Sequence, residues 1–279
     1  MVLYRRIRRI RYNNPMSIYT VMTFNLMNRL TSASFHRRAS GILELIRTYD
    51  PDILGIQEFC DYMLEDLDSL TDTYTMIGAA RGARPSFANE RNCVLVRKGM
   101  FKVLDSHTYW LSKTPDIPGS RLTGSMFPRI VTMVTLQDKH HTFTVANTHL
   151  DHMFEYVRVS QAEILGDLLN EANDGEMTIL TGDFNTILSQ RTLRTLTEKT
   201  GLRDVSPYNP TATIRSIIRL AGNRYSPIDH ILVSKKAHVM QAKIITSMFM
   251  GSYPSDHFPV VAEIELPESY LSDESNSRA

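Results

Sequence analysis

The sequence predicts a layered α/β sandwich, and three observations lead to this fold class. A chain of 279 residues can bury one large core, and no stretch in its middle has the composition of a linker. Strand-like segments outnumber helix-like segments, of which we expect about four. The strands do not alternate regularly with helices, as they would in a strictly parallel sheet. We therefore expect one catalytic-size domain of sheets and covering helices.

The first elements show the clearest periodicity. Residues 18–24, with the sequence IYTVMTF, form an apolar run of strand type that ends at Asn25. A helix follows, because apolar residues then recur at helical steps, at Phe35, Ala39, Ile42, Ile46 and Tyr49. This helix ends at Asp50-Pro51, and the stretch DILGIQE at 52–58 is the next short strand.

The rest of the chain adds further strand candidates and a second clear helix. The helix spans about residues 155–173, and one of its sides carries Val157, Gln161, Leu165, Leu168 and Ala172. The strand candidates cover residues 93–97, 102–111, 129–136, 142–148, 177–183, 229–234 and 258–264.

Composition indicates a globular protein without a membrane span. Hydrophobic residues make up 42% and charged residues 22% of the chain, and no apolar stretch approaches the roughly 18 residues that a spanning helix needs. The two cysteines, Cys60 and Cys93, form no C-x-x-C pair, and the N-terminus lacks an apolar segment of signal-peptide type. We expect a cytoplasmic location, and the sequence predicts no oligomeric state.

Charge separates the two ends from the body of the chain. The first 11 residues carry five arginines and no acid, so the remainder has a net charge of −4 against +1 for the whole. We interpret residues 1–15 as a basic, disordered arm, with nucleic-acid or anionic-lipid contact as the alternative. The domain itself is expected at 16–266, and 267–279 has the composition of a polar tail.

Polar residues recur where an apolar strand stops. They are Asn25, Glu58, His149 and, in TILTGDFNTIL at 178–188, Asp183 and Asn185. Strand ends are rigid and lie near the surface, so residues there can turn toward a common cleft. Because side chains alternate along a strand, Asp183 and Asn185 should face this cleft while Phe184 points back into the protein.

The candidate set is rich in oxygen ligands. It comprises Glu58, Asp183, Asp229 and Asp256 with the amides of Asn25 and Asn185. Hard cations such as Mg²⁺ or Mn²⁺ take carboxylate, amide and water oxygens and leave positions open for phosphate. Metal-assisted hydrolysis of a phosphoester is the natural use of such a set.

Two other catalytic classes fit less well. The stretch NTHLDH at 147–152 is close to the H-x-H-x-D-H zinc motif of metallo-β-lactamase-like hydrolases, but Asn147 stands where its first histidine belongs. A serine nucleophile is disfavoured because the chain contains no G-x-S-x-G, and neither cysteine has the surroundings of a catalytic thiol.

Six motifs occur in the order and at roughly the spacing found in the endonuclease/exonuclease/phosphatase superfamily. They are TFNLMN, PDILGIQE, NTHLDH, LTGDFN, PIDHILVS and SDHFPV, and together they extend from about Tyr19 to Glu265. The chain therefore resembles this superfamily of deoxyribonuclease-like enzymes, and YWLSKTPDIPGS followed by FPRI resembles its bacterial and deadenylase-related branch. The resemblance implies a four-layer α/β/β/α sandwich.

The resemblance also implies how a metal would be held. Glu58 would be the principal ligand of Mg²⁺ or Mn²⁺, with Gln57 as support. Asn25 would help to hold the phosphate or the metal-bound water, and Asp256 would lie on the metal side.

Roles in hydrolysis follow from the same resemblance. Asp183 would orient or deprotonate the attacking water, and Asn185 would bind the scissile phosphate. His257 would contact the phosphate and pair with Asp229. His149 would be the second imidazole, with Glu90 in NERNCVLV as its carboxylate partner.

Substrate recognition is the part that the resemblance specifies least. Arg129 resembles the arginine that approaches phosphate oxygens in several members. Relatives often have Gly-Trp-Asp where this chain has Arg121-Leu122-Thr123, and the stretch TATIRSIIRLAGNRY at 211–225 also departs from their pattern.

Some polar and aromatic residues have a structural interpretation. We expect surface or helix-start positions for His140, His141, His152 and His238. Asp151 with His152 is a candidate cap for the helix near 154. Tyr109 and Trp110 are expected to pack rather than to stack on a nucleobase.

Three functional classes therefore remain. The first is a metal-dependent phosphodiesterase or nuclease acting on nucleic acid, a nucleotide or a small phosphoester. The second is a phosphomonoesterase on a sugar or inositol phosphate, and the third is an inactive binding module. The mildly acidic body argues against a long basic groove for nucleic acid.

Overall fold

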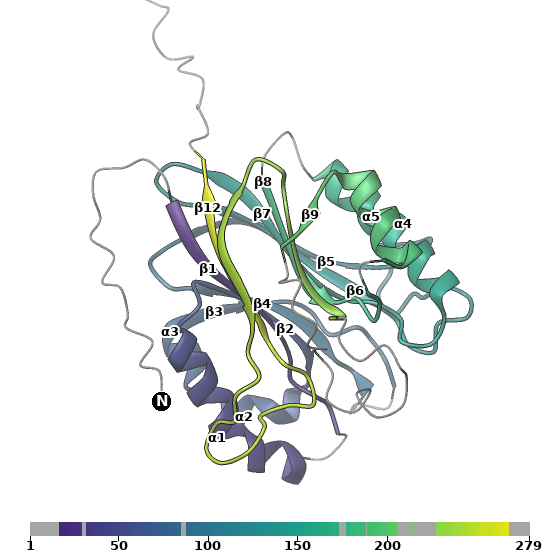
Figure 1. The fold of residues 1–279 in the computed structure, drawn as a ribbon. Helices are drawn as coiled ribbons and strands as arrows, with labels where there is room; N and C mark the ends of the chain where they lie inside the picture. Colours follow the sequence, from purple (N-terminus) through teal and green to yellow (C-terminus); the bar gives the residue numbers. More distant parts are fainter. Residues whose placement is uncertain are drawn as a thin grey trace, which may run out of the picture.

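In a computed structural model, the chain forms two six-stranded mixed sheets that face one another (Figure 1). The structure describes residues 17–29, 32–84, 88–172, 177–187, 189–205, 213 and 227–267. The first sheet has the order β11 (His238–Ile244), β12 (Val260–Leu266), β1 (Ser17–Asn25), β2 (Ile53–Phe59), β4 (Arg91–Arg97) and β3 (Tyr74–Ile77). The second has the order β5 (Lys102–Trp110), β6 (Ile130–Gln137), β7 (Thr142–His149), β8 (Met177–Asp183), β10 (Asp229–Val233) and β9 (Arg203–Asp204).

Helices cover the two outer faces of this sandwich (Figure 1). The first sheet is covered by α1 (Ser32–Tyr49), with the short segments η1 (Asp61–Met63), α2 (Leu64–Leu67) and α3 (Leu70–Thr73) beside it. The second sheet is covered by α4 (Glu155–Glu171) and α5 (Arg191–Thr200). The order helix, sheet, sheet, helix confirms the predicted four-layer α/β/β/α sandwich.

Three apolar layers hold the four layers together. Phe35, Ile42 and Ile46 of α1 pack against the outer face of the first sheet. A second cluster, which includes Val21 and Val145, lies between the sheets. The third cluster joins α4 and α5 to the second sheet. Each strand of the central pairs is therefore buried on both faces, which explains their unbroken apolar runs.

The long elements lie where periodicity predicts them, and several short ones were missed. The sequence analysis did not identify β3, β9, β11 or α5. The edge strand β11 has the half-exposed pattern of HVMQAKI, and β9 has only two residues. Helix α5 buries only Thr192, Leu193 and Leu196, too few for a recognisable apolar face.

Strand topology brings the polar strand ends to one edge of the sandwich. β1 and β2 are parallel, with Asn25 opposite Gln57, and β7 and β8 are parallel, with His149 opposite Asp183. β10 runs antiparallel to β8 and begins at Asp229, opposite Asp183. Parallel strands end on the same side, so residues that are distant in sequence meet there.

Other expectations have mixed outcomes. Trp110 is buried and its Nε1 donates to the Arg81 carbonyl at 2.7 Å, so it packs as expected. The surface position predicted for His141 is wrong, because its ring is buried beside Asp138. Among the described helices, none is long and apolar enough to cross a membrane. The basic arm, the stretch 211–225 apart from Thr213, and the polar tail after residue 267 lie outside the described residues.

Candidate active site

A polar cavity of about 290 Å³ opens at the edge where the central strands end. It is lined by Asn28, Glu58, Arg81, Glu90, Phe127, Arg129, His149, His152, Asp183, Asn185 and His257. Seven of these residues, among them Glu58, Asp183 and His257, were singled out from the sequence as candidate catalytic, substrate-binding or metal-binding residues. The structure therefore brings residues from five of the six motifs to a single cavity, together with Glu90 and Arg129 from two other segments.

Asp183, the last residue of β8, is at the centre of the polar contacts. Its Oδ2 accepts a hydrogen bond from Asn25 Nδ2 at 3.0 Å and lies 3.5 Å from His149 Nε2 and 3.8 Å from His257 Nε2. Its Oδ1 accepts the backbone N–H of Asn185 at 2.9 Å. Both Asp183 and Asn185 line the cavity, whereas Phe184 is fully buried on the opposite side, as the strand alternation predicts.

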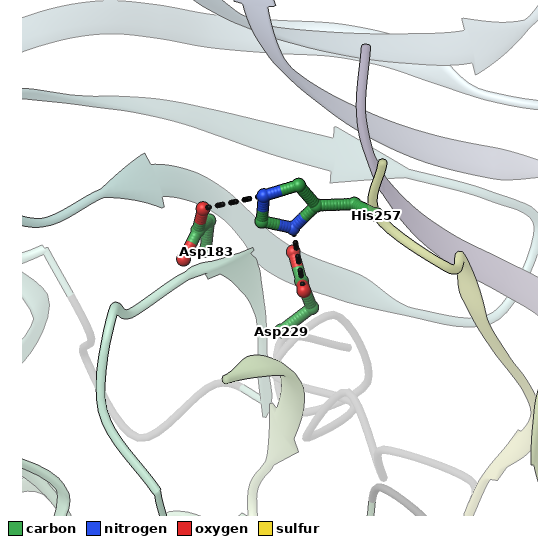
Figure 2. A group of neighbouring side chains, drawn as sticks. All are labelled: Asp183, Asp229 and His257. Atoms are coloured by element: carbon green, nitrogen blue, oxygen red, sulfur yellow. Dashed lines mark hydrogen bonds and ion pairs between the residues drawn. The ribbon is translucent and has the colours of Figure 1, made fainter. Parts of the chain in front are cut away.

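His257 lies between two carboxylates, Asp183 and Asp229 (Figure 2). Its Nδ1 donates to Asp229 Oδ2 at 2.9 Å, and its Nε2 faces Asp183. Burial disfavours the charged ring, but the charge of Asp229 and its hydrogen bond outweigh burial and raise the pKa of His257 from 6.5 to about 10. His257 is therefore an imidazolium at neutral pH.

The surroundings of Asp183 disfavour its charged form, in contrast to those of His257. Burial and then the charge of Asp229 raise the pKa of Asp183 from 3.8 to about 6, while His257 partly offsets both. A carboxylate with this pKa is ionised at pH 7 and is a better proton acceptor than an ordinary aspartate.

His149 differs from His257 in charge. Burial and then the cation of Arg129 hold the pKa of His149 well below its usual value of 6.5. The ring is therefore neutral, and its approach to Asp183 is not an ion pair. The expected pair between His149 and Glu90 is not formed, because Nδ1 of His149 has no hydrogen-bond partner among the described residues.

Asn25 links the two carboxylates that face the cavity from different sheets. Its Nδ2 donates both to Asp183 and to Glu58 Oε1, each at 3.0 Å, while its Oδ1 accepts the backbone N–H of Met27. The amide NH2 of Asn25 thus points at both carboxylates, and its oxygen accepts from the backbone. The side chain is therefore better placed to bridge the carboxylates than to bind a metal. Glu58 is half-buried and also accepts the backbone N–H of Asn28.

The donor set near Glu58 fits a hard divalent cation. A partly exposed carboxylate faces a polar cavity with a second carboxylate, Asp183, held nearby through Asn25. Asp183, Asp229 and His257 also have donor atoms within 4.8 Å of one another. In this structure Nδ1 of His257 is already used by Asp229 at 2.9 Å, so these three residues form a hydrogen-bonded acid–imidazole pair beside Asp183.

Two site residues adopt a backbone conformation that non-glycine residues rarely take. Glu58 has φ of 60° and Asn185 has φ of 50°. The pairing of β2 with β4 shifts register between Ile56 and Phe59, beside Glu58. Such left-handed residues cost about 1 to 3 kcal/mol each and cluster at functional sites, so both side chains are aimed at the cavity at a cost to stability.

Two buried arginines, Arg81 and Arg129, line the cavity and form its arginine wall. Arg81 Nη1 forms an ion pair with Glu90 Oε2 at 2.7 Å, and its guanidinium lies 4.7 Å from the centre of the Phe127 ring. Arg129 Nη2 lies 2.9 Å from His152 Nδ1, and its Nε has no hydrogen-bond partner among the described residues. This wall offers positive charge to an anionic ligand.

Several sequence expectations do not match the cavity. Asp256 is not among its lining residues and contacts the Ser255 hydroxyl instead. Gln57 is fully buried and donates to Asn147 Oδ1 at 2.7 Å between the sheets. Asn147, which replaces the first histidine of the zinc motif, is buried in the same network, away from any open metal position.

Sequence reasoning missed four lining residues. Asn28 lies just after β1, and its proximity to a strand end was the available signal. Arg81 lies in coil without periodicity, so nothing local distinguished it, and Phe127 belongs to the motif FPRI but was given no role there. His152 was expected at the surface or at a helix start. It lies just before α4 and also borders the cavity next to Arg129, while Asp151 accepts the backbone N–H groups of Met153 and Phe154 at the start of that helix.

Solved structures with the same architecture include bacterial and human proteins. An endonuclease/exonuclease/phosphatase family protein from Bacteroides thetaiotaomicron is 27% identical, with a TM-score of 0.78 over 90% of this chain and 99% of that chain. A mannosyl-6-phosphatase of the same organism is 27% identical, with a TM-score of 0.74 over 88% and 98%. The human Nocturnin catalytic domain shares the fold at 21% identity, with a TM-score of 0.71 over 88% and 93%.

Comparisons at the level of sequence give two results. No curated protein matches the chain significantly. The sequence model of the Endonuclease/Exonuclease/phosphatase family, by contrast, matches residues 22–257, which span Met22 in β1 through His257 in the cavity. The chain belongs to the Endonuclease/Exonuclease/phosphatase family.

Proposed function

We propose that this protein is a divalent-metal-dependent phosphodiesterase or nuclease that cleaves its substrate by in-line attack of water. Members of its family are phosphoester hydrolases and depend on a divalent metal. The observation that carries the proposal is the chain of contacts from Glu58 through Asn25 to Asp183, His257 and Asp229. It joins a metal-type carboxylate, a base and a cationic imidazole in one cavity.

The side chains divide the chemistry between the nucleophile and the phosphate. Asp183 orients the attacking water and accepts its proton, which a carboxylate of pKa about 6 does well at neutral pH. His257, charged through Asp229, meets the negative charge that develops on the phosphoryl oxygens. Asn185 and Arg129 bind those oxygens, and neutral His149 faces the same position.

Glu58 is the residue we propose to hold Mg²⁺ or Mn²⁺. When bound, the ion supplies neutralisation of phosphoryl charge and stabilisation of the leaving oxygen. Asn25 keeps Glu58 and Asp183 at a fixed separation by donating to both. The two cysteines, Cys60 and Cys93, are both buried and neither forms a disulfide, which supports a reducing compartment such as the cytoplasm.

A phosphomonoesterase is the second candidate, and the arginine wall is the observation that favours it. A monoester phosphate carries about two negative charges near neutral pH, and Arg129 supplies a cation to the cavity beside Arg81, whose own charge is paired with Glu90. A neighbour that is 27% identical is a mannosyl-6-phosphatase. We retain this reading for a sugar or inositol phosphate.

A substrate panel distinguishes these candidates. Bis-p-nitrophenyl phosphate, p-nitrophenyl phosphate, sugar phosphates, duplex DNA and short RNA are assayed with Mg²⁺ and with Mn²⁺, and Asp183→Asn is the inactive control. We expect hydrolysis that the control lacks, with the diester preferred. A preference for the monoester would select the second candidate, and hydrolysis of every substrate no faster than without protein would refute both.

A further inference from the structure

His230 is a fully buried histidine that the proposed chemistry does not use. It follows Asp229 in β10, and its ring contacts a carboxylate on one side and a backbone carbonyl on the other. Its Nδ1 lies 2.6 Å from Asp204 Oδ2, and its Nε2 lies 3.0 Å from the carbonyl oxygen of Thr186. An ionised carboxylate and a carbonyl can only accept hydrogen bonds, so both ring nitrogens donate.

The carboxylate of Asp204 balances the positive charge of the His230 ring. Burial disfavours the imidazolium, but the charge of Asp204 and its hydrogen bond outweigh burial and raise the pKa of His230 above 6.5. The ring also packs edge to face with Phe184, at 5.7 Å between centres and 72° between planes. His230 thus touches both Phe184 and Thr186, which flank Asn185.

The turn that His230 touches carries the two residues that we assign to the water and the phosphate. Asn185 holds a left-handed backbone with φ of 50°, and its backbone N–H donates to Asp183 Oδ1. Its Nδ2 donates to the Leu150 carbonyl at 3.1 Å. A carbonyl anchored just after Asn185 limits rotation of the turn about that residue.

We propose that His230 is a positioning residue, whose Nε2–H anchors the Thr186 carbonyl and thereby fixes the Asp183–Asn185 turn against the substrate. Asp204 holds the ring with Nε2 protonated and directed at this carbonyl. The catalytic consequence rests on the proposed hydrolytic function, whereas the anchoring of the turn does not. Small displacements of catalytic groups reduce turnover strongly, which is why one hydrogen bond behind the turn matters.

The test compares three variants that share one background. Asp204→Asn is that background, because removing His230 alone would take the cationic ring away from a buried carboxylate. In it, the neutral ring can still donate from Nε2 to Thr186 while Nδ1 accepts from the new amide. To this background we add His230→Phe, which keeps an aromatic ring but cannot donate, or His230→Gln, whose amide can donate to Thr186.

With bis-p-nitrophenyl phosphate as substrate, we expect His230→Phe to lower kcat about 10- to 100-fold relative to the background and to change KM little. This is the usual loss when a residue that holds a functional group from behind is removed. His230→Gln should recover much of this loss. A packing role predicts the reverse order, since Phe fills the space better than Gln. Thermal melts confirm that each variant is folded at the assay temperature.

Hydrogen exchange of the peptide covering residues 183–190 tests the anchor without any substrate. We expect faster exchange in the His230→Phe variant than in the background, and slower exchange in the His230→Gln variant than in the Phe variant. Equal kcat for the background and the Phe variant, or equal losses for Phe and Gln, would overturn the proposal. If the wild-type protein hydrolyses nothing, the hydrolytic function fails, and unchanged exchange in the Phe variant would then overturn the anchor as well.

Discussion

Two ionisable residues in the cavity have their pKa values moved so that they complement each other. Burial raises the pKa of Asp183 to about 6, and Asp229 raises that of His257 to about 10, so between these values one is an anion and the other a cation. A base and a positive group for phosphate are thus both in their working states over a broad pH range around neutrality.

Replacing Asp229 with Asn should shift the pH dependence of hydrolysis to lower pH. Without the neighbouring charge, burial lowers the pKa of His257, so the ring loses its proton at a lower pH and kcat falls. A pH–rate profile measures the shift of the alkaline limb. Asp116→Asn is the control, because it makes the same change at an exposed carboxylate that does not line the cavity. Identical profiles for the wild type and Asp229→Asn would remove Asp229 from this role.

The same pair gives a stability prediction with a defined sign. The folded pKa of His257, about 10, lies above its unfolded value of 6.5. Its contribution to stability is therefore fully present below pH 6.5 and is lost as pH rises toward about 10. Melting temperatures of Asp229→Asn and wild type should differ most near pH 6 and converge toward pH 10.

Substitutions at Asp183 and at Asn185 should impair hydrolysis in different ways. Asp183→Asn removes a positioned base and should lower kcat by roughly two to four orders of magnitude with KM largely unchanged. Asn185→Ala should cost about 3 kcal/mol of transition-state stabilisation, the usual scale for one preorganised donor. Steady-state kinetics on both variants measure these losses, and near wild-type kcat in Asp183→Asn would contradict the assignment.

Residues of the site were predictable where the backbone sets their direction. Asn25, His149 and Asp183 end strands, so period-two alternation and the stop of an apolar run identify them. Arg81 and Phe127 come from coil, where no period exists and only tertiary packing fixes the side chain. The pairing of Glu90 with Arg81 instead of His149 could not be predicted for the same reason.

At the scale of single elements, the end of β8 places a catalytic residue, Asp183, next to a residue that stabilises the fold, Phe184. Phe184 is fully buried in the cluster under α4 and α5, on the side away from the cavity. Phe184→Ala should cost about 3 to 5 kcal/mol of unfolding free energy. Chemical denaturation measures this loss. Leu196→Ala, in the same cluster but on α5 rather than at the end of β8, is the control for a loss of packing alone.

Most elements were predictable in proportion to their length and burial, and the exposed nine-residue edge strand β5 is the exception. The central strands β1, β7 and β8 are buried on both faces and give continuous apolar runs. The edge strands β3, β9 and β11 are short or half-exposed, so pairing with a neighbour, which sequence does not display, is what makes them strands. Solvent-facing residues on an edge carry little pattern.

The whole molecule depends on the close approach of the two sheets. Gly55 in β2 lies where a Cβ atom would overlap Thr181 Oγ1 and come within 2.8 Å of Asn147 Oδ1. Both neighbours are buried in the second sheet. Gly55→Ala should therefore destabilise the fold by about 1 to 3 kcal/mol, and Gly99→Ala, which meets nothing within 4 Å but has positive φ, serves as a surface comparison. Equal stability of Gly55→Ala and wild type would contradict this packing.

Metal-dependent hydrolysis centred on Glu58 is tested most directly by titrating metal-free protein with Mg²⁺ while following bis-p-nitrophenyl phosphate. Protein stripped by a chelator and verified by elemental analysis should be inactive, and Mg²⁺ or Mn²⁺ should restore turnover. Glu58→Gln should require more metal or remain inactive, because the amide of Gln has no negative charge to attract the cation. Full turnover in verified metal-free protein, or an unchanged metal requirement in Glu58→Gln, would contradict the proposed site.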